Sequence, residues 1–223
     1  MSTQSFSRRV FSRLLLRYAE TRIYRTDNIS LLGFRLIIPP TVFHPALFFS
    51  SKILGRYVAG MPLSGKRVLD MGSGSGIIGL CAARAGANVL AVDRNQAAVS
   101  ATQMNIEQNN FSNRISVCQS DLFDSIPVGD RFDWIIWNPP FYPKVQTSDE
   151  SLAWNAGENY ETISRFAIEV RNWLDLNGSV LLILSSDVDE MDICKLFKAQ
   201  GFTVVPLSSS RRLFERLTIY QFN

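Results

Sequence analysis

The stretch Val68-Leu-Asp-Met-Gly-Ser-Gly-Ser-Gly76 places three glycines, at every second position, between two apolar runs. Glycine adopts backbone conformations closed to other residues and allows close approach to the main chain, so this pattern predicts a strand, a tight turn and a helix. In open α/β sheets such a turn lies at the carboxyl end of its strand, where ligands bind. Residues 74–79 also fit GxGxxG, the fingerprint of dinucleotide-binding domains. That match alone leaves the ligand open.

Strand and helix patterns alternate downstream of this turn. The run Val180-Leu-Leu-Ile-Leu184 is apolar throughout, which is typical of a strand buried on both faces of a parallel sheet. The sequence therefore predicts a three-layer, doubly wound α/β domain. Its last two strands are joined by a Ser/Arg loop that is too short for a crossover helix, so we expect them to be antiparallel. Asn177-Gly178 is expected to end the third helix. We expect strands over 67–70, 87–93, 114–118, 132–138, 179–184, 202–206 and 213–222, and helices over 77–84, 96–109, 160–174 and 188–200.

The composition limits which kinds of protein and of functional site the chain can form. Of 223 residues 46% are hydrophobic, and no run approaches the roughly 20 apolar residues that cross a bilayer, so we expect a soluble, cytoplasmic protein. The cysteines Cys81, Cys118 and Cys194 are odd in number and far apart, which argues against a disulfide framework and against metal ligation. With His44 as the one histidine, we expect neither a metal site nor a Ser/His/Asp arrangement.

The amino-terminal segment is strongly basic. The first 35 residues hold seven arginines against Glu20 and Asp27, which leaves +5, whereas the whole chain carries +3. Apolar residues recur at every fourth position from Phe6 to Tyr18, which predicts a helix with one apolar stripe. Its arginines either meet nucleic acid or an acidic protein surface, or form an ordinary solvated helix face. The lack of acids in the first 19 residues also allows an organelle presequence, although the stripe already explains the segment. We divide the chain into a basic helical arm and leading segment, 1–60, and a main domain, 61–223.

Acids follow three of the predicted strands. Asp70 lies two residues before Gly72, where a carboxylate disfavours a pyrophosphate and favours a positively charged ligand. Asp93 ends the second strand, where an acid can bind both ribose hydroxyls of NAD or of S-adenosylmethionine (SAM). Asp121 follows the third strand and can accept a hydrogen bond from the amine of adenine, although a loop or N-cap role explains it equally well.

Together the glycine turn, the acid-ended second strand and the antiparallel final strands resemble the class I SAM-dependent methyltransferases, from about residue 40 to the end. The resemblance implies a seven-stranded Rossmann-like sheet of order 3-2-1-4-5-7-6 with strand 7 antiparallel. It also implies SAM as the cofactor. The residues expected to bind SAM are Thr41, Asp70, Gly72, Ser73, Gly74, Gly76, Asp93, Arg94, Asp121, Leu122 and Asn138.

A second motif, Asn138-Pro-Pro-Phe141, follows the central strand and is expected to face the cofactor. The prolines fix the turn, and the side-chain oxygen of Asn138 and the carbonyl of Pro139 can accept the N–H groups of a planar nitrogen. Phe141 can stack on that flat acceptor and hold it in line with the methyl donor. A plain strand-ending Pro-Pro turn is the alternative, but it leaves the polar and aromatic flanks unexplained. The expected catalytic residues are Asn138, Pro139, Pro140 and Phe141.

This tetrapeptide resembles the NPPY motif of HemK-type protein glutamine methyltransferases and of nucleic-acid amino-methyltransferases, with Phe141 in place of tyrosine. The segment Pro39-Pro-Thr-Val-Phe-His-Pro45 resembles the one that closes the active site in HemK-type enzymes. An exposed or capping role for His44, and a surface-loop role for Trp154 and Glu158, are the alternatives to substrate contact. The expected substrate-binding residues are Phe43, His44, Pro45, Tyr142 and Trp154.

Three hypotheses for function remain open. The compact frame looks like the short HemK-type enzymes, which implies that the acceptor is a glutamine side-chain amide in a protein, such as the Gly-Gly-Gln loop of a release factor. An exocyclic amine of rRNA or tRNA is the second hypothesis, and the arginine-rich start and Arg211-Arg212 support it. The third is a SAM-fold binding module without catalysis, which the intact motifs at Asp70 and Asn138 disfavour.

Overall fold

The computed structural model describes residues 25–140, 160–212 and 215–223. The predicted amino-terminal helix therefore lies outside the described residues, as do Phe141, Tyr142, Trp154 and Glu158. The strands are β1 (Asp27–Leu31), β2 (Phe34–Ile38), β3 (Arg67–Met71), β4 (Asn88–Asp93), β5 (Ile115–Gln119), β6 (Phe132–Trp137), β7 (Leu174–Ser185), β8 (Val204–Arg212) and β9 (Glu215–Phe222). The helices are α2 (Phe49–Ala59), α3 (Ile77–Arg84), α4 (Gln96–Gln108), α5 (Glu161–Glu169) and α6 (Glu190–Ala199), with a 3-10 turn over Val170–Trp173.

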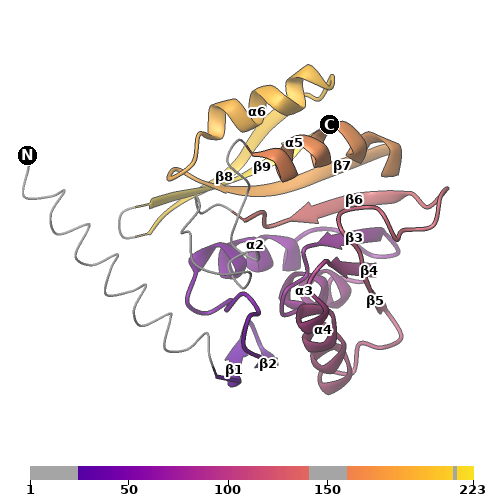
Figure 1. Ribbon diagram of the computed structural model, residues 1–223, viewed down its shortest axis with the longest axis vertical. Helices are drawn as coiled ribbons and strands as arrows, with labels where there is room; N and C mark the ends of the chain where they lie inside the picture. The colour runs from indigo at the N-terminus through magenta and orange to yellow at the C-terminus, as the bar shows by residue number, and fades with distance from the viewer. Residues whose placement is uncertain (1–24, 141–159, 213–214) are drawn as a thin grey trace, which may run out of the picture.

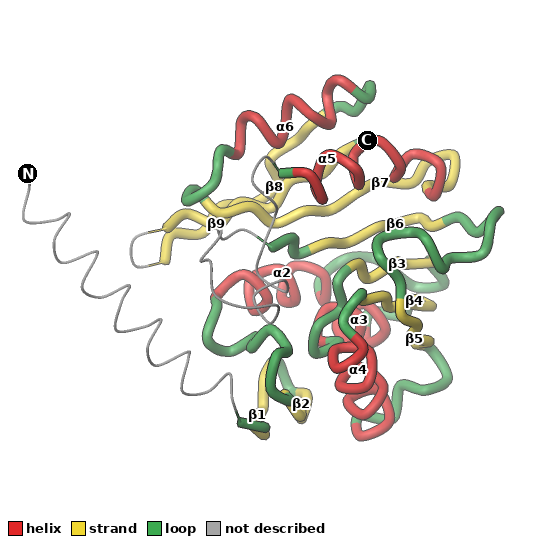
Figure 2. The backbone as a smooth tube through the Cα atoms, viewed as in Figure 1, coloured by secondary structure: helices red, strands yellow, loops and turns green. Residues whose placement is uncertain are grey.

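Seven of the strands form one sheet in the order β5-β4-β3-β6-β7-β9-β8. The strands from β3 to β7 pair in parallel, whereas β9 runs antiparallel to both of its neighbours. Numbered from β3 as the first strand, this is the predicted order 3-2-1-4-5-7-6, which is confirmed. The carboxyl ends of β3, β4 and β6 consequently lie side by side, because these strands are parallel and adjacent (Figures 1 and 2).

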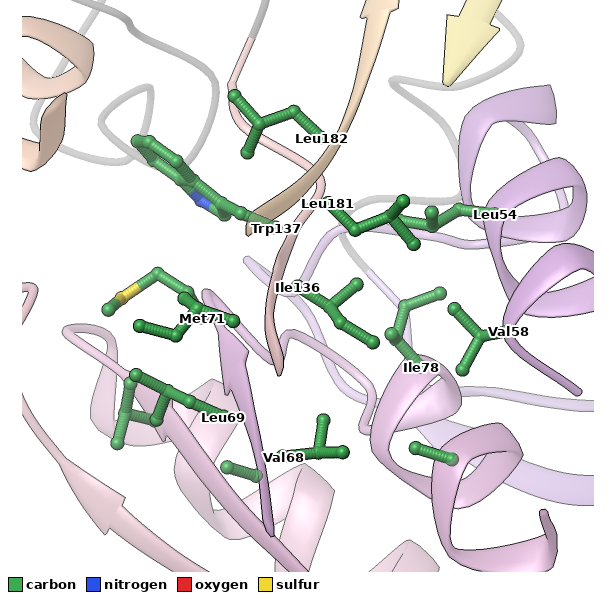
Figure 3. Close-up of a cluster of buried hydrophobic side chains, with 14 of the residues drawn as sticks. Leu54, Val58, Val68, Leu69, Met71, Ile78, Ile136, Trp137, Leu181 and Leu182 are labelled. Carbon is green, nitrogen blue, oxygen red and sulfur yellow. The ribbon is translucent and has the colours of Figure 1, made fainter. Parts of the chain in front are cut away.

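Helices cover both faces of this sheet. Ile136 points toward Leu54 and Val58 of α2 and toward Ile78 of α3, whereas its neighbour Trp137 points to the other side of β6 (Figure 3). The Trp137 ring packs on Phe166 of α5 with ring centres 4.5 Å apart. This alternation follows from the two-residue period of a strand, and it buries the end of β6 on both faces of the sheet.

The leading segment contains structure that the sequence patterns did not reveal. The hairpin β1–β2 turns at Leu32 and Gly33, whose φ angles are both positive, as the tight hairpin turn requires. Asn105 of α4, and Asn109 directly after that helix, hydrogen-bond the main chain of β2 at Ile37 and Arg35. These amides hold the hairpin against the helix that flanks the glycine turn.

Two sequence predictions of the fold were wrong in detail. The third helix ends before Leu174, which already belongs to β7, and Asn177-Gly178 lies within that strand rather than at a helix end. The pairing of β6 with β7 is irregular there, because Phe132 pairs with Leu174 but Trp134 pairs with Ser179. The turn-forming dipeptide therefore accommodates a bulge.

The Ser/Arg segment was also wrongly predicted as a loop. Residues 208–212 pair with β9 as part of β8, after a register shift between Pro206 and Ser208. An edge strand tolerates polar side chains and a proline, since one of its sides has no strand to bond. A prediction based on the periodicity of apolar residues therefore misses such a strand.

Candidate active site

The glycine turn leaves β3 at Met71 and enters α3 at Ile77. Gly72, Gly74 and Gly76 all have positive φ angles, of 64°, 54° and 77°. A methyl group added at Gly76 would lie 3.0 Å from Cγ2 of Thr102, and one at Gly72 would lie 3.2 Å from Nε1 of Trp137. Glycine is therefore required here both by the backbone conformation and by close packing.

Side chains from α4 brace this turn. The Ser73 and Thr102 hydroxyls lie 3.1 Å apart, and Thr102 donates to the carbonyl of Gly74. Asn105 donates to the carbonyl of Ser75 while it also bonds Ile37 of the hairpin. The turn is thus held in one shape without a ligand, which lowers the cost of binding one.

Asp70 lies beneath the turn and is 2% exposed. Its Oδ2 accepts a 2.8 Å hydrogen bond from the N–H of Gly79 in the first turn of α3. Burial raises the pKa of Asp70 to about 7, against the lowering effect of the Gly79 bond. This geometry supports an electrostatic effect of Asp70 on a cationic ligand through the turn, rather than a contact at its surface.

Asp93 ends β4 beside the turn. Its Oδ2 accepts from the N–H of Gly74 at 2.9 Å, and its Oδ1 accepts from the N–H of Asn95 at 2.9 Å. Burial raises the pKa of Asp93, although both of these N–H groups act to lower it. Because each carboxylate oxygen has a second lone pair, Asp93 can still accept hydroxyl protons of a ligand.

The other expected cofactor residues lie around the same edge of the sheet. Asp121 is exposed, and its Oδ2 forms a 3.1 Å ion pair with Arg165 of α5. Leu122 is buried with a positive φ of 50°, and Arg94 is exposed beside Asp93. The structure brings Asp70, Asp93 and the glycines together, whereas Asp121 is engaged by Arg165.

The segment expected to close the site lies over the turn. Thr41 is partly buried with a positive φ of 68°, and its carbonyl accepts a bond from the side chain of Asn95. The Phe43 side chain is near Gly74 and stacks on Phe48 with ring centres 4.9 Å apart. A β-branched residue such as Thr41 is strained at positive φ. The hydrogen bond from Asn95 and the packing of Phe43 stabilise the backbone in this otherwise unfavourable conformation.

His44 and Pro45 are both buried. Nε2 of His44 lies 3.1 Å from Oδ2 of Asp27, and Nδ1 accepts from the N–H of Ala46. Both ring nitrogens therefore have protein partners, and these tie the closing segment to β1. An exposed His44 is therefore excluded, and the two bonds favour a structural role for it over the substrate contact that the resemblance implied.

Asn138 follows the last residue of β6. Its Nδ2 donates to the hydroxyls of Ser50 and Ser51, each at 3.2 Å. Its Oδ1 is shielded from solvent and has no hydrogen-bond partner among the described residues. An unmade bond of this kind costs about 1 to 3 kcal/mol, so it calls for a functional explanation. Pro139 is buried and Pro140 is partly buried, which fixes the chain beyond this amide.

The described residues offer little other chemistry. Within them, no group of three or more His, Cys, Asp or Glu side chains is arranged to hold a metal ion. Burial raises the pKa values of the Cys81, Cys118 and Cys194 thiols, which makes them poor nucleophiles. No helix in the described ranges is long and apolar enough to span a membrane.

Sequence reasoning missed the residues that support these groups. Asn95 could have been found, because it precedes a helix and caps it through its bond with the N–H of Ala97. Ser50, Ser51 and Asn105 gave no signal, since their partners lie between 30 and 88 residues away in the chain.

Comparisons with known proteins identify the class. The family model of the methyltransferase small domain matches residues 40–199. A protein of Methanocaldococcus jannaschii, named provisionally as a protein N5-glutamine methyltransferase, is 31% identical over 199 residues, which cover 86% of this chain and 96% of that protein. A tRNA1(Val) (adenine(37)-N6)-methyltransferase of a Shewanella species is 34% identical over 126 residues, 53% of this chain and 52% of that one.

A solved structure shows the same fold. The 16S rRNA N2 G1207 methyltransferase of T. thermophilus, in complex with AdoMet and guanosine, superposes with a TM-score of 0.66 at 22% identity. The match covers 89% of this chain and 50% of that one. At this identity the likeness shows the fold alone.

The sheet order is that of a Rossmann-like fold, and the family model and the M. jannaschii relative show that the class is that of the SAM-dependent methyltransferases. Within that class, the chain belongs to the methyltransferase small domain family. The hypotheses of an NAD-binding domain and of a module without catalysis are therefore not retained. The chain spans nearly the whole length of the M. jannaschii relative but only about half of the Shewanella enzyme.

Proposed function

We propose that this protein transfers a methyl group from SAM to the side-chain amide nitrogen of a glutamine in a protein. The unpartnered Oδ1 of Asn138 carries the proposal. It is an acceptor held at the end of the central strand, next to the glycine turn, and a planar nitrogen with N–H groups is what would satisfy it.

The choice of a protein acceptor rests on similarity. The relative that matches almost end to end is named, provisionally, for N5-glutamine methylation, and a ribosomal protein uL3 glutamine methyltransferase of Francisella tularensis is 30% identical over 139 residues. Such an acceptor is macromolecular, and a cytoplasmic location fits it.

The residues present fit SAM, which supplies an electrophilic methyl group on a positively charged sulfur. Gly72, Gly74 and Gly76 would let its chain lie against the backbone, and Asp93 would take its ribose hydroxyls. Asp70 would favour its positive charge from below. Ser73, Arg94, Asp121, Leu122 and Thr41 stay predicted contacts around these groups.

The acceptor side would work by hydrogen bonding. An amide nitrogen is a poor nucleophile because its lone pair is delocalised into the carbonyl group. Oδ1 of Asn138 would accept one N–H and the carbonyl of Pro139 the other, which localises electron density on nitrogen and orients it. The nitrogen carries the new positive charge after transfer, and a proton then leaves it. Phe141, Tyr142 and Trp154 stay predicted substrate contacts outside the described residues.

An exocyclic amine of rRNA or tRNA is the second candidate. It is also a planar nitrogen, and relatives are named for tRNA and rRNA methylation. Both candidates use the same two acceptors, so they differ in what the surrounding surface binds.

Methyl transfer from tritiated SAM into cell extract distinguishes them. We expect label that survives nuclease, is lost with protease, and is released as methylamine by acid hydrolysis, since an N-methylated side-chain amide hydrolyses that way. The Asn138→Ala protein, run in parallel, should lose at least about 100-fold in turnover while SAM affinity changes only a few-fold. Label that nuclease removes would overturn the glutamine assignment.

A further inference from the structure

The amide of Asn138 is held from a distant part of the chain. Ser50 and Ser51 lie in the first turn of α2, 88 and 87 residues before Asn138, and both are 4% exposed. Each hydroxyl oxygen lies 3.2 Å from Nδ2. Two hydroxyls therefore accept from the one nitrogen of this carboxamide.

The structure places Nδ2 of the carboxamide, and not Oδ1, against the two serines. The group is planar, so holding Nδ2 at the serines turns Oδ1 away from them. Oδ1 then has no partner among the described residues, although it is buried. If the amide were rotated by 180°, Nδ2 would take the place of Oδ1. Its N–H groups would then face the N–H groups of an incoming amine.

The helix that carries the serines is firmly placed. Leu54 and Val58 are fully buried on the side that faces α3 and Ile136 (Figure 3). A methyl group at Gly55 would lie 2.8 Å from Cδ1 of Leu32 and 3.3 Å from Sγ of Cys81, so α2 approaches the hairpin and α3 as closely as glycine allows. Such packing gives the two hydroxyls fixed positions.

We propose that Ser50 and Ser51 are positioning residues for methyl transfer: they hold the Asn138 carboxamide in the orientation in which its oxygen meets the acceptor. The proposal rests on the proposed function only in requiring an acceptor that carries N–H groups. It holds for a glutamine amide and for an RNA base amine alike.

The kinetic test uses whichever extract fraction, protein or RNA, takes label from tritiated SAM. The Ser50→Ala/Ser51→Ala protein should lose about 30- to 100-fold in turnover at saturating SAM, with SAM affinity within about twofold. Each single variant should lose about three- to tenfold, and these serve if the double variant folds poorly. Ser179→Ala removes another buried hydroxyl, one that bonds Asn223, and should leave turnover unchanged.

A double-mutant cycle separates positioning from a general loss of stability. In an Asn138→Ala background, removal of both serine hydroxyls should lower turnover by less than about twofold further, because their effect passes through the missing amide. A full additional loss in that background would contradict the proposal. Full turnover in the double serine variant, with Asn138→Ala inactive, would contradict it while leaving the proposed function intact. If Asn138→Ala is itself fully active, the proposed function fails first.

A measurement on the resting protein needs no acceptor. The Nδ2 protons of Asn138, identified by their absence from the spectrum of Asn138→Ala, should exchange with solvent at least about tenfold faster in the double serine variant, since buried hydrogen-bonded protons are protected. Ser179→Ala should not change them. Equal exchange in the wild type and the double serine variant would overturn the proposal.

Discussion

The two halves of the candidate site differ in how their polar groups are satisfied. On the cofactor side, both oxygens of Asp93 accept backbone N–H groups, and Asp70 bonds Gly79. On the proposed acceptor side, Oδ1 of Asn138 is buried and has no hydrogen bond within the described residues. The polar groups of the glycine turn are thus satisfied within the protein, whereas the proposed acceptor side leaves one buried oxygen that a bound amine could satisfy. The free energy gained when an amine bonds to Oδ1 of Asn138 can then act on the nitrogen that reacts.

Loss of a glycine should break the cofactor side most severely. In Gly76→Ala, a side chain at a φ of 77° and 3.0 Å from Thr102 adds about 2 to 3 kcal/mol of strain and displaces the turn. We expect SAM affinity, measured by calorimetry, to fall about 30- to 150-fold.

Gly65 provides the matched control, because it also has a positive φ, of 74°, but nothing lies within 4 Å of an added methyl group. Gly65→Ala should lower stability without changing SAM affinity. Equal SAM affinity in the Gly76 and Gly65 variants would refute a role for the turn in binding.

Removal of the acid at the end of β4 should have the next largest effect. Asp93→Ala should weaken SAM binding by about 1 to 3 kcal/mol, because ribose hydroxyls and the N–H of Gly74 both lose their acceptor. Asp133→Ala also removes an acid that accepts a backbone N–H, from Arg67, and should leave SAM affinity unchanged. A wild-type affinity in Asp93→Ala would rule out its assigned role.

The buried acid beneath the turn should make SAM binding depend on pH. Burial raises the pKa of Asp70 to about 7, so the stabilisation from its proton is fully present below about pH 4, where the unfolded chain also binds that proton, and is lost as pH rises through 7. The free energy of unfolding should fall over that range, and burial of Asp93 acts in the same direction. A cationic ligand favours ionised Asp70, so SAM should bind about tenfold more tightly at pH 8 than at pH 6.

Asp70→Asn should remove most of that pH dependence while it keeps an acceptor for Gly79. Titrations of both proteins at pH 6 and pH 8 measure the difference directly. An unaltered slope in the variant would assign the dependence to another group.

The smallest effect is expected at His44. His44→Ala should lower stability by about 1 to 2 kcal/mol, through loss of its bond to Asp27, with turnover within about twofold of wild type. Asp27→Asn weakens the same contact and should behave alike in denaturant unfolding. A loss of turnover of more than tenfold in His44→Ala alone would instead place His44 at the substrate.

The sequence predicted the parts of the molecule that local patterns encode. The glycine turn and the helix over 77–84 follow from glycine spacing and apolar periodicity among residues close together in the chain, whereas the strand order was an implication of the family resemblance. The β1–β2 hairpin was missed because its strands are short, partly polar and outside the main sheet. Asn177-Gly178 was misassigned because the same dipeptide suits a helix end and a bulge.

The site divides in the same way. Asn138 and Asp93 could be predicted from their places at strand ends, because parallel strands bring those ends together. The serines that hold Asn138, and the arginine that engages Asp121, could not, since only tertiary packing joins them. The place of a residue at the end of a strand can be predicted from the local sequence, whereas the distant side chains that hydrogen-bond it cannot.

The central claim is that Asn138 acts through an acceptor oxygen. Single-turnover rates for Asn138→Ala and Asn138→Asp at saturating SAM test it most directly. A carboxylate keeps an oxygen toward the acceptor and can take hydroxyl protons from Ser50 and Ser51, so the Asp variant should stay within about tenfold of wild type while the Ala variant loses at least about 100-fold. Wild-type rates in the Ala variant, or equal loss in both, would contradict the account.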